Sequence, residues 1–255
     1  MKLFISIATY NESHNIEKLI RALYSLNLPE LNVVIVDDNS PDGTSEIVVR
    51  LQSHFSSLHL IKRERKSGYG GAHVEGFRYA LKKDADVVIS MDADFSHNPV
   101  KIPEMLEEVK QGFDVVVGSR RVEQGKVIGW SLWRKCCSKG AMMLSKALLG
   151  IKTKDLTSGY RAYRREVLER INVEKILSNG YSFLEEMIYW VETAGFKVKE
   201  IPIVFRDRQF GKSKLSKWEI LKFFVTIFKL KYLTIKLLHK EPKKASKKAL
   251  LIDRD

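Results

Sequence analysis

Short runs of apolar, mostly β-branched residues alternate with stretches of helical periodicity, and this alternation limits the fold of the chain more than any other feature. In Ile16 to Leu23 and Thr44 to Leu51, apolar residues recur every three or four positions, as on one face of a helix. Strands that alternate with helices form a parallel sheet with helices on its faces. The runs that we predict to be strands are Leu3 to Ala8, Asn32 to Asp37, Leu58 to Lys62, Ala85 to Met91 and Phe113 to Gly118.

The pattern changes after residue 119, where longer helices and polar turns replace the regular alternation. A chain of 255 residues with 44% hydrophobic residues can bury one large core, so we expect one compact α/β domain followed by a tail. In this second part we predict helices at Trp130 to Leu149 and Phe183 to Ala194, a polar turn at Asp155 to Gly159, and a last strand at Lys197 to Phe205 that returns to the sheet.

The N-terminal apolar run and the cysteines indicate in which cellular compartment the protein lies. The apolar run from Leu3 to Ala8 is too short for a signal peptide or membrane anchor, because polar residues follow it at once. The two cysteines, Cys136 and Cys137, are adjacent in a predicted helix, a poor geometry for a disulfide between distant elements. We therefore expect a cytoplasmic protein.

The chain carries a formal net charge of +13, which favours polyanionic partners. Nucleic acid, anionic lipid headgroups and small molecules with phosphate groups all satisfy this charge. Most of the excess lies between Arg206 and Asp255, where fifteen Lys or Arg stand against five Asp or Glu, a net charge of +10. The charge alone does not choose among the three partner classes.

Residues 215–240 form an amphipathic pattern in which apolar and aromatic residues alternate with lysines. The lysines break every apolar run that would be long enough to span a bilayer. Two interpretations stay open: a helix that lies in the headgroup layer of a membrane, or a helix that packs on the core. Residues 241–255 continue as a basic tail.

Polar residues follow four of the predicted strands at their carboxyl ends, where open parallel sheets bind ligands. Asp92 and Asp94 end the fourth strand, and two carboxylates there can share Mg²⁺ or Mn²⁺ with a diphosphate. An Asp-x-Asp is also common in solvated turns, but its location at a strand end favours the metal site. Asp37 and Asp38 can accept hydrogen bonds from a base or ribose, or form an ordinary turn.

Two further segments have a functional and a structural interpretation. Gly68, Gly70 and Gly71 permit close approach of a phosphate or make a flexible turn, and they do not form a nucleotide-hydrolase phosphate loop. The cationic stretch from Arg206 to Lys214 suits a phosphate clamp or is a solvated charge run. None of the six histidines has the spacing of a catalytic triad or a zinc site, so we assign them no catalytic role.

Six motifs in combination point to one family. They are Ala8 to Glu12, Val36 to Thr44, Met91 to His97, Gly118 to Arg120, Asp155 to Arg164, and Asp207-Arg208 with Ser213-Lys214. Together they resemble the family 2 glycosyltransferases of the GT-A fold, and within that family the dolichol-phosphate mannosyltransferases. The resemblance covers nearly all of the chain before residue 216, and it implies a GT-A catalytic domain over residues 1–214.

The resemblance also implies site residues. The nucleoside would contact Ala8, Tyr10, Glu12, Val36 and Asp38, while Asp92, Ala93 and Asp94 would hold the diphosphate, with Asp92 and Asp94 binding the metal. Arg120, Arg208 and Lys214 would face donor or acceptor phosphates, and with Asp94 they are the expected catalytic residues. Ser158 and its neighbours would line the acceptor side.

Three positions depart from the pattern of the family. Ala8 stands where Pro is usual, Leu184 where Gln is frequent, two residues before the acidic position that Glu186 matches, and Lys212 where Glu is usual. Many members also carry transmembrane helices after the catalytic domain, whereas this chain has only the amphipathic segment. No presumed metal ligand is lost, but the preferred sugar and acceptor are left open.

The function implied is inverting transfer of mannose from GDP-mannose to dolichyl or polyprenyl phosphate, giving a lipid-linked donor for glycan assembly. A phosphate acceptor is ionised at neutral pH and needs no strong general base, and no base is evident in the sequence. The alternatives are UDP-glucose as donor, a saccharide hydroxyl as acceptor, a nucleic-acid-binding module, and a catalytically silent membrane scaffold. We expect peripheral attachment to the cytosolic face of a membrane, where a separate subunit could also anchor the chain.

Overall fold

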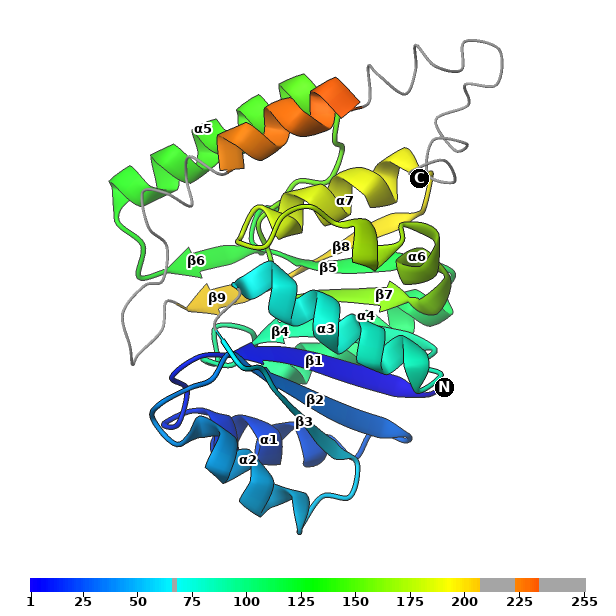
Figure 1. Cartoon of the computed structure of the whole chain (residues 1–255). Helices are drawn as coiled ribbons and strands as arrows, with labels where there is room; N and C mark the ends of the chain where they lie inside the picture. Colours follow the sequence, from blue (N-terminus) through cyan, green and yellow to red (C-terminus); the bar gives the residue numbers. More distant parts are fainter. Residues whose placement is uncertain (66–67, 207–222, 234–255) are drawn as a thin grey trace.

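The structure is a computed structural model that describes residues 1–65, 68–206 and 223–233. A sheet of seven strands in the order β3-β2-β1-β4-β7-β5-β8 runs through the molecule (Figure 1). Only β7 is antiparallel to its neighbours in this sheet. The prediction of a mostly parallel sheet flanked by helices is therefore confirmed.

The five predicted strands of the first half are present, each within two residues of the expected ends. The strands of the main sheet are β1 (Leu3–Thr9), β2 (Leu31–Asp37), β3 (Leu58–Lys62), β4 (Val87–Asp92), β5 (Val115–Ser119), β7 (Arg161–Arg164) and β8 (Val198–Pro202). The helices are α1 (Ile16–Tyr24), α2 (Thr44–Gln52), α3 (Tyr69–Lys82), α4 (Ile102–Lys110), α5 (Leu132–Leu149), α6 (Arg165–Arg170) and α7 (Phe183–Thr193), with 3₁₀ turns η1 (Pro99–Lys101) and η2 (Val173–Lys175).

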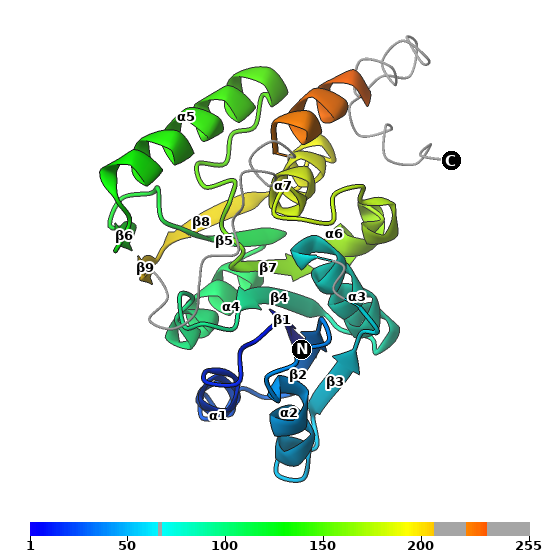
Figure 2. The ribbon, with the colours of Figure 1, turned by 60° about the vertical axis from the view of Figure 1, so that its left-hand side comes forward.

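Each face of the sheet has its own hydrophobic core. Helices α1, α2 and α4 cover one face, where Ile5 and Ile7 of β1 point. Helices α3, α6 and α7 cover the other face, onto which Phe4 of the same strand points (Figure 2). Because successive residues of a strand point to opposite faces, a strand that is buried on both faces reads as a continuous apolar run.

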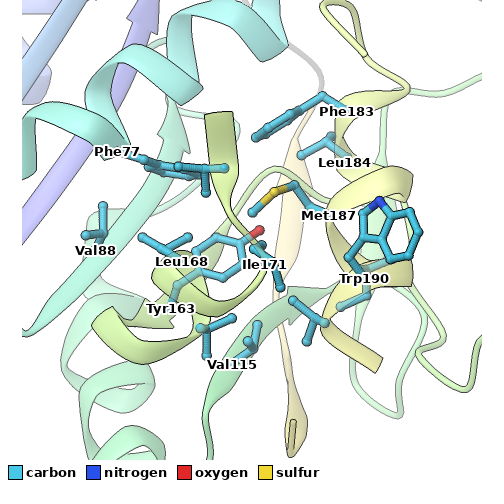
Figure 3. Packing of buried hydrophobic residues seen from close by; sticks show 14 of the residues in the cluster. Phe77, Val88, Val115, Tyr163, Leu168, Ile171, Phe183, Leu184, Met187 and Trp190 are labelled. Carbon is cyan, nitrogen blue, oxygen red and sulfur yellow. The ribbon is translucent and has the colours of Figure 1, made fainter. Parts of the chain in front are cut away.

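The core beneath α7 is rich in aromatic residues (Figure 3). Phe77 of α3 packs edge-on against Tyr163 of β7, with ring centroids 5.5 Å apart. Leu184, which stands where the family often has Gln, is buried in this cluster beside Met187 (Figure 3). The leucine therefore belongs to the core, where an unpaired amide would be unfavourable.

The predicted strand from Lys197 to Phe205 is divided in two. β8 joins the main sheet, whereas β9 (Val204–Arg206) pairs in parallel with β6 (Lys126–Ile128) in a separate two-stranded sheet. Pro202 ends β8, and proline has no N–H to continue a ladder of hydrogen bonds. The prediction of one continuous strand was wrong because Pro202 interrupts the ladder of hydrogen bonds.

The glycines near residue 70 do not form a flexible turn. Gly70 and Gly71 lie in the first turn of α3, where a β-carbon on Gly70 would lie 2.6 Å from Phe183 Cβ. Glycine is needed there because the helix start and the segment before α7 approach so closely. Of the two interpretations, the flexible turn is wrong, and phosphate binding stays a prediction.

The C-terminal helix is present in the described part, residues 223–233. It lies near α5 and α7 at the end of the molecule away from α1 and α2 (Figures 1 and 2). Ile227 and Leu230 are buried, and Leu230 belongs to the core beneath α7. No helix among the described residues is long and apolar enough to cross a membrane. The remainder of the segment 215–240, and the tail 241–255, lie outside the described residues.

Candidate active site

The strand register brings three of the predicted site residues into one row. Ala8 on β1 pairs with Val36 on β2 on one side and with Asp92 on β4 on the other. Because all three strands are parallel, this row lies at the shared carboxyl edge of the sheet. The residues predicted to hold the nucleoside and the diphosphate therefore begin from adjacent points.

The loops after β1 and β2 are joined by hydrogen bonds. The Asn11 N–H donates to Ser40 Oγ (2.9 Å), and the Glu12 N–H donates to Thr44 Oγ1 (3.0 Å). These bonds tie the loop that carries Tyr10 to the turn that carries the second aspartate pair. The Glu12 side chain is buried at this junction.

Asp37 and Asp38, which the sequence left equivalent, have different environments. Asp37 is fully buried and accepts hydrogen bonds from Thr9 Oγ1 (2.8 Å), the Ser40 N–H (2.9 Å) and Ser45 Oγ (2.8 Å). Its carboxylate holds the turn together, and contact of either aspartate with a base or ribose stays a prediction.

Asp38 forms a buried ion pair that the sequence did not indicate. Arg63 Nη1 donates to Asp38 Oδ1 over 2.8 Å, and the Gly68 N–H donates to the other carboxylate oxygen over 3.2 Å. Arg63 follows β3 in a run of basic residues, and nothing else in the sequence indicates that it lies near Asp38. Arg63 therefore fixes the position of the Asp38 carboxylate beside the row of strand ends.

Asp92, Ala93 and Asp94 form a turn whose backbone is held by His97. The Asp92 N–H donates to His97 Nδ1 over 2.9 Å, so this nitrogen carries no proton. Burial lowers the pKa of His97, although Asp92 and Asp94 act in the opposite direction. His97 is therefore a neutral ring that supports the turn, and sequence reasoning had given it no role.

Tyr69, the first residue of α3, contacts the Asp92 carboxylate directly. Its hydroxyl donates to Asp92 Oδ1 over 3.0 Å. Burial and the charge of Asp92 raise the pKa of the Tyr69 phenol well above its usual range, so the hydroxyl remains a donor. This contact was also missed, because a tyrosine inside a glycine-rich stretch gives no signal of its partner.

The oxygens at this turn suit a hard divalent cation. Among the described residues, no group of three or more His, Cys, Asp or Glu could hold a metal. The turn itself carries two carboxylates, those of Asp92 and Asp94. The buried Ser96 Oγ has no hydrogen-bond partner within the described part of the chain, and the Ser96 N–H donates to Asp94 Oδ1 (3.1 Å). Mg²⁺ and Mn²⁺ accept such oxygen ligands and take the others from water or phosphate.

Arg120, which was expected to face a phosphate, forms an ion pair with a carboxylate of the protein. It follows β5 and is buried, and its guanidinium makes a two-point contact with Asp155, Nε to Oδ2 at 2.8 Å and Nη2 to Oδ1 at 2.7 Å. Nη2 also donates to Thr157 Oγ1 over 2.8 Å. This ion pair fixes the segment around Asp155, and contact of Arg120 with a phosphate stays a prediction.

The remaining predicted residues are split between the core and the segments that are not described. Ser158 is buried, and its hydroxyl donates to the Gly118 carbonyl, which joins the acceptor-side motif to β5. Arg208, Lys212 and Lys214 lie outside the described residues, so their roles stay predictions.

Comparison with solved structures supports the fold. The chain matches glucosyl-3-phosphoglycerate synthase from Mycobacterium tuberculosis, in complex with Mn²⁺, uridine diphosphate and phosphoglyceric acid, with a TM-score of 0.66 and 17% sequence identity. The match covers 90% of this chain and 78% of the synthase chain. At this identity the likeness concerns the fold alone.

Comparison of sequences identifies the family. The model of "Glycosyl transferase family 2" matches residues 4–171. An undecaprenyl-phosphate mannosyltransferase from Micrococcus luteus is 39% identical over 216 residues, which cover 85% of this chain and 88% of the relative. A polyprenol monophosphomannose synthase from Mycolicibacterium smegmatis is 38% identical over 216 residues, covering 84% and 81%. The chain is therefore a glycosyltransferase and belongs to glycosyl transferase family 2.

Proposed function

We propose that the chain transfers mannose from GDP-mannose to a polyprenyl phosphate, with inversion at the anomeric carbon. Two relatives that are nearly 40% identical over most of their length carry names that specify polyprenyl-phosphate mannosyl transfer. The observation that carries the proposal is the row formed by Ala8, Val36 and Asp92, because it sets the residues expected to contact the nucleoside beside the carboxylate turn.

In this proposal the two ends of the donor are held by different loops. The nucleoside contacts Tyr10, Glu12 and Asp38 beyond the ends of β1 and β2. The Asp92–Asp94 turn holds Mg²⁺ or Mn²⁺, which when bound neutralises charge on the departing diphosphate. Arg63 fixes the Asp38 carboxylate on the nucleoside side through their ion pair.

The acceptor side needs no general base when the acceptor is a phosphate, because its oxygen is ionised at neutral pH. The histidine beside the site, His97, is buried and its Nδ1 already accepts a hydrogen bond from the Asp92 N–H. It is therefore unsuited to deprotonate a saccharide hydroxyl. We assign the acceptor phosphate to Arg208 and Lys214, and to Arg120 the task of holding the segment around Asp155.

An exposed apolar face supports a lipid-borne acceptor. Residues 223–233 bury one side in the core and expose Val225, Phe228 and Tyr232 at helical spacing on another. The nearby α5 exposes Leu132, Met143 and Leu144. Lys139, Lys229 and Lys231 are also exposed in these two elements, and basic residues beside apolar ones favour anionic headgroups. We propose that this face, the α5/C-terminal face, lies against the membrane.

The direct test measures transfer of radiolabel from GDP-mannose and, in parallel, UDP-glucose to dolichyl or undecaprenyl phosphate in detergent with Mn²⁺ or Mg²⁺. We expect metal-dependent mannolipid, and a loss of roughly hundredfold or more in Asp94→Ala. Glu107→Ala, which changes an exposed carboxylate on α4, serves as the matched control. If only UDP-glucose gives label in the lipid phase, the proposed donor is wrong. If the folded protein transfers neither sugar to lipid, the proposal of a phosphate acceptor is wrong.

A further inference from the structure

The hydrogen bond between Tyr69 and Asp92 joins the first residue of a helix to the last residue of the strand that follows it, 23 positions away. Tyr69 begins α3, and Asp92 ends β4. The start of α3 is itself anchored, since the Gly70 N–H donates to the Asn179 carbonyl over 2.8 Å. The phenol therefore approaches the carboxylate from a fixed point.

The space for the Tyr69 hydroxyl depends on Gly159. A β-carbon at position 159 would lie 2.2 Å from the Tyr69 hydroxyl oxygen, well inside contact distance, and 3.5 Å from Tyr69 Cζ and from Asp92 Oδ1. Only the hydroxyl is in conflict, because 3.5 Å is an ordinary contact. Glycine at position 159 thus has a specific reason, which is to leave room for the oxygen that binds Asp92.

The ring of Tyr69 is held on two sides. It stacks on Tyr181 with centroids 5.0 Å apart and an interplanar angle of 20°, and it meets His73 edge-on at 4.6 Å. An aromatic ring that is packed in this way loses little further freedom when its hydroxyl forms a hydrogen bond. The geometry suits a side chain that orients its partner.

We infer that Tyr69 is a positioning residue for Asp92: it holds Oδ1 so that Oδ2 is directed to the divalent cation, and Gly159 makes the contact possible. This inference rests on the proposed role of Asp92 as a metal ligand. Within the described residues, Asp92 Oδ2 accepts no hydrogen bond and lies 3.8 Å from His97 Nδ1, which already accepts the Asp92 N–H. Groups that orient a metal ligand typically change metal affinity by 10–100-fold when they are removed.

The test compares Tyr69→Phe, Gly159→Ala and the double variant, with Tyr24→Phe as a matched control at a distant hydroxyl that contacts Ser57. Binding of Mn²⁺ in the presence of GDP is followed by the electron paramagnetic resonance signal of free Mn²⁺. We expect Tyr69→Phe to weaken Mn²⁺ binding roughly tenfold and Tyr24→Phe to leave it unchanged. Mannosyl transfer by Tyr69→Phe should recover at high Mn²⁺, which a merely structural defect would not permit.

The double variant supplies the second criterion. Gly159→Ala should weaken Mn²⁺ binding at least as much as Tyr69→Phe, but should add almost nothing in the Tyr69→Phe background, because the conflicting oxygen is then absent. Two results would overturn the inference: additive effects of the two substitutions, or an Mn²⁺ affinity of Tyr69→Phe equal to that of the wild type. In either case, metal-dependent transfer by the wild type would still support the proposed function. A wild type that binds no Mn²⁺ with GDP would remove the inference together with its premise.

Discussion

Glu185 and Glu186 are adjacent on α7 and both are buried, yet their carboxylates have different partners. Glu186 accepts hydrogen bonds from the Leu177 and Ser178 N–H groups, at 3.0 and 2.9 Å. Glu185 accepts one from Ser145 Oγ at 2.8 Å, and its Oε2 is buried without a partner among the described residues. An ionised carboxylate is poorly compensated in such a place.

Burial raises the pKa of Glu185 to about 8 from an ordinary value of 4.5. Since the folded state holds this proton more tightly than the unfolded state, its contribution to stability is complete below pH 4.5 and is lost as the pH rises through 8. The loss approaches about 1.4 kcal/mol for each pH unit within that window. We expect Glu185→Gln, which resembles the protonated form, to remove this slope in urea unfolding at pH 5.5 and 7.5.

Glu186→Gln is the matched control for that measurement. In the wild type, the two carboxylate oxygens of Glu186 face backbone N–H donors, so the amide of glutamine would set an N–H group against another donor. We expect this variant to be less stable than the wild type at both pH values. Equal pH slopes in the wild type and Glu185→Gln would mean that Glu185 is ionised in the folded protein.

The junction between α3 and the segment before α7 sets the position of the first turn of α3. A β-carbon on Gly70 would lie 2.6 Å from Phe183 Cβ and 2.7 Å from the Ser178 carbonyl, whereas one on Gly140 of α5 would meet nothing within 4 Å. We expect Gly70→Ala to lower the free energy of unfolding by roughly 1–3 kcal/mol and Gly140→Ala to raise it by about 0.5–1 kcal/mol. Chemical denaturation measures both, and an unaffected Gly70→Ala would mean that the junction yields easily.

The helices and strands themselves show how much of the fold could be predicted from the sequence. Apolar runs revealed the strands that are buried on both faces, and their polar ends indicated the site edge. β7 was missed because it begins with Arg161, which is fully buried and donates to the Leu184 and Leu156 carbonyls at 2.7 and 2.6 Å. A charged residue in a short strand resembles a turn until its partners are known.

For the site, as for the fold, the sequence predicted the positions of residues better than their contacts. Asp92 and Asp94 were identified by their place after an apolar run, but the contacts of Tyr69 and His97 with Asp92 depend on long-range packing. The family resemblance implied that Arg120 faces a phosphate, and nothing in the sequence pairs it with Asp155, 35 positions away. Sequence position gives the location of a charge, whereas its partner follows from the fold.

At the scale of the whole molecule, one face carries both exposed apolar side chains and exposed lysines. The α5/C-terminal face exposes Leu132 to 80%, Phe228 to 61% and Tyr232 to 64%, and exposed lysines lie in the same elements. At the opposite end, α2 exposes Val49 to 57% (Figure 1). In residues 223–233 one side packs on the core, as one of the two interpretations of the amphipathic segment requires, and contact of the exposed side with a membrane stays a prediction.

If the exposed side contacts lipid, replacing its aromatic residues must weaken membrane binding. We expect the double variant Phe228→Ser/Tyr232→Ser to lower partitioning onto vesicles that contain anionic lipid by roughly tenfold or more, because two apolar groups no longer leave water. Val49→Ser, a change of similar polarity at the distant end, should partition as the wild type does. Higher salt should weaken the wild type, since lysines contribute through screened attraction. Co-sedimentation with vesicles measures all three, and unchanged binding of the double variant would place the membrane contact on another part of the chain.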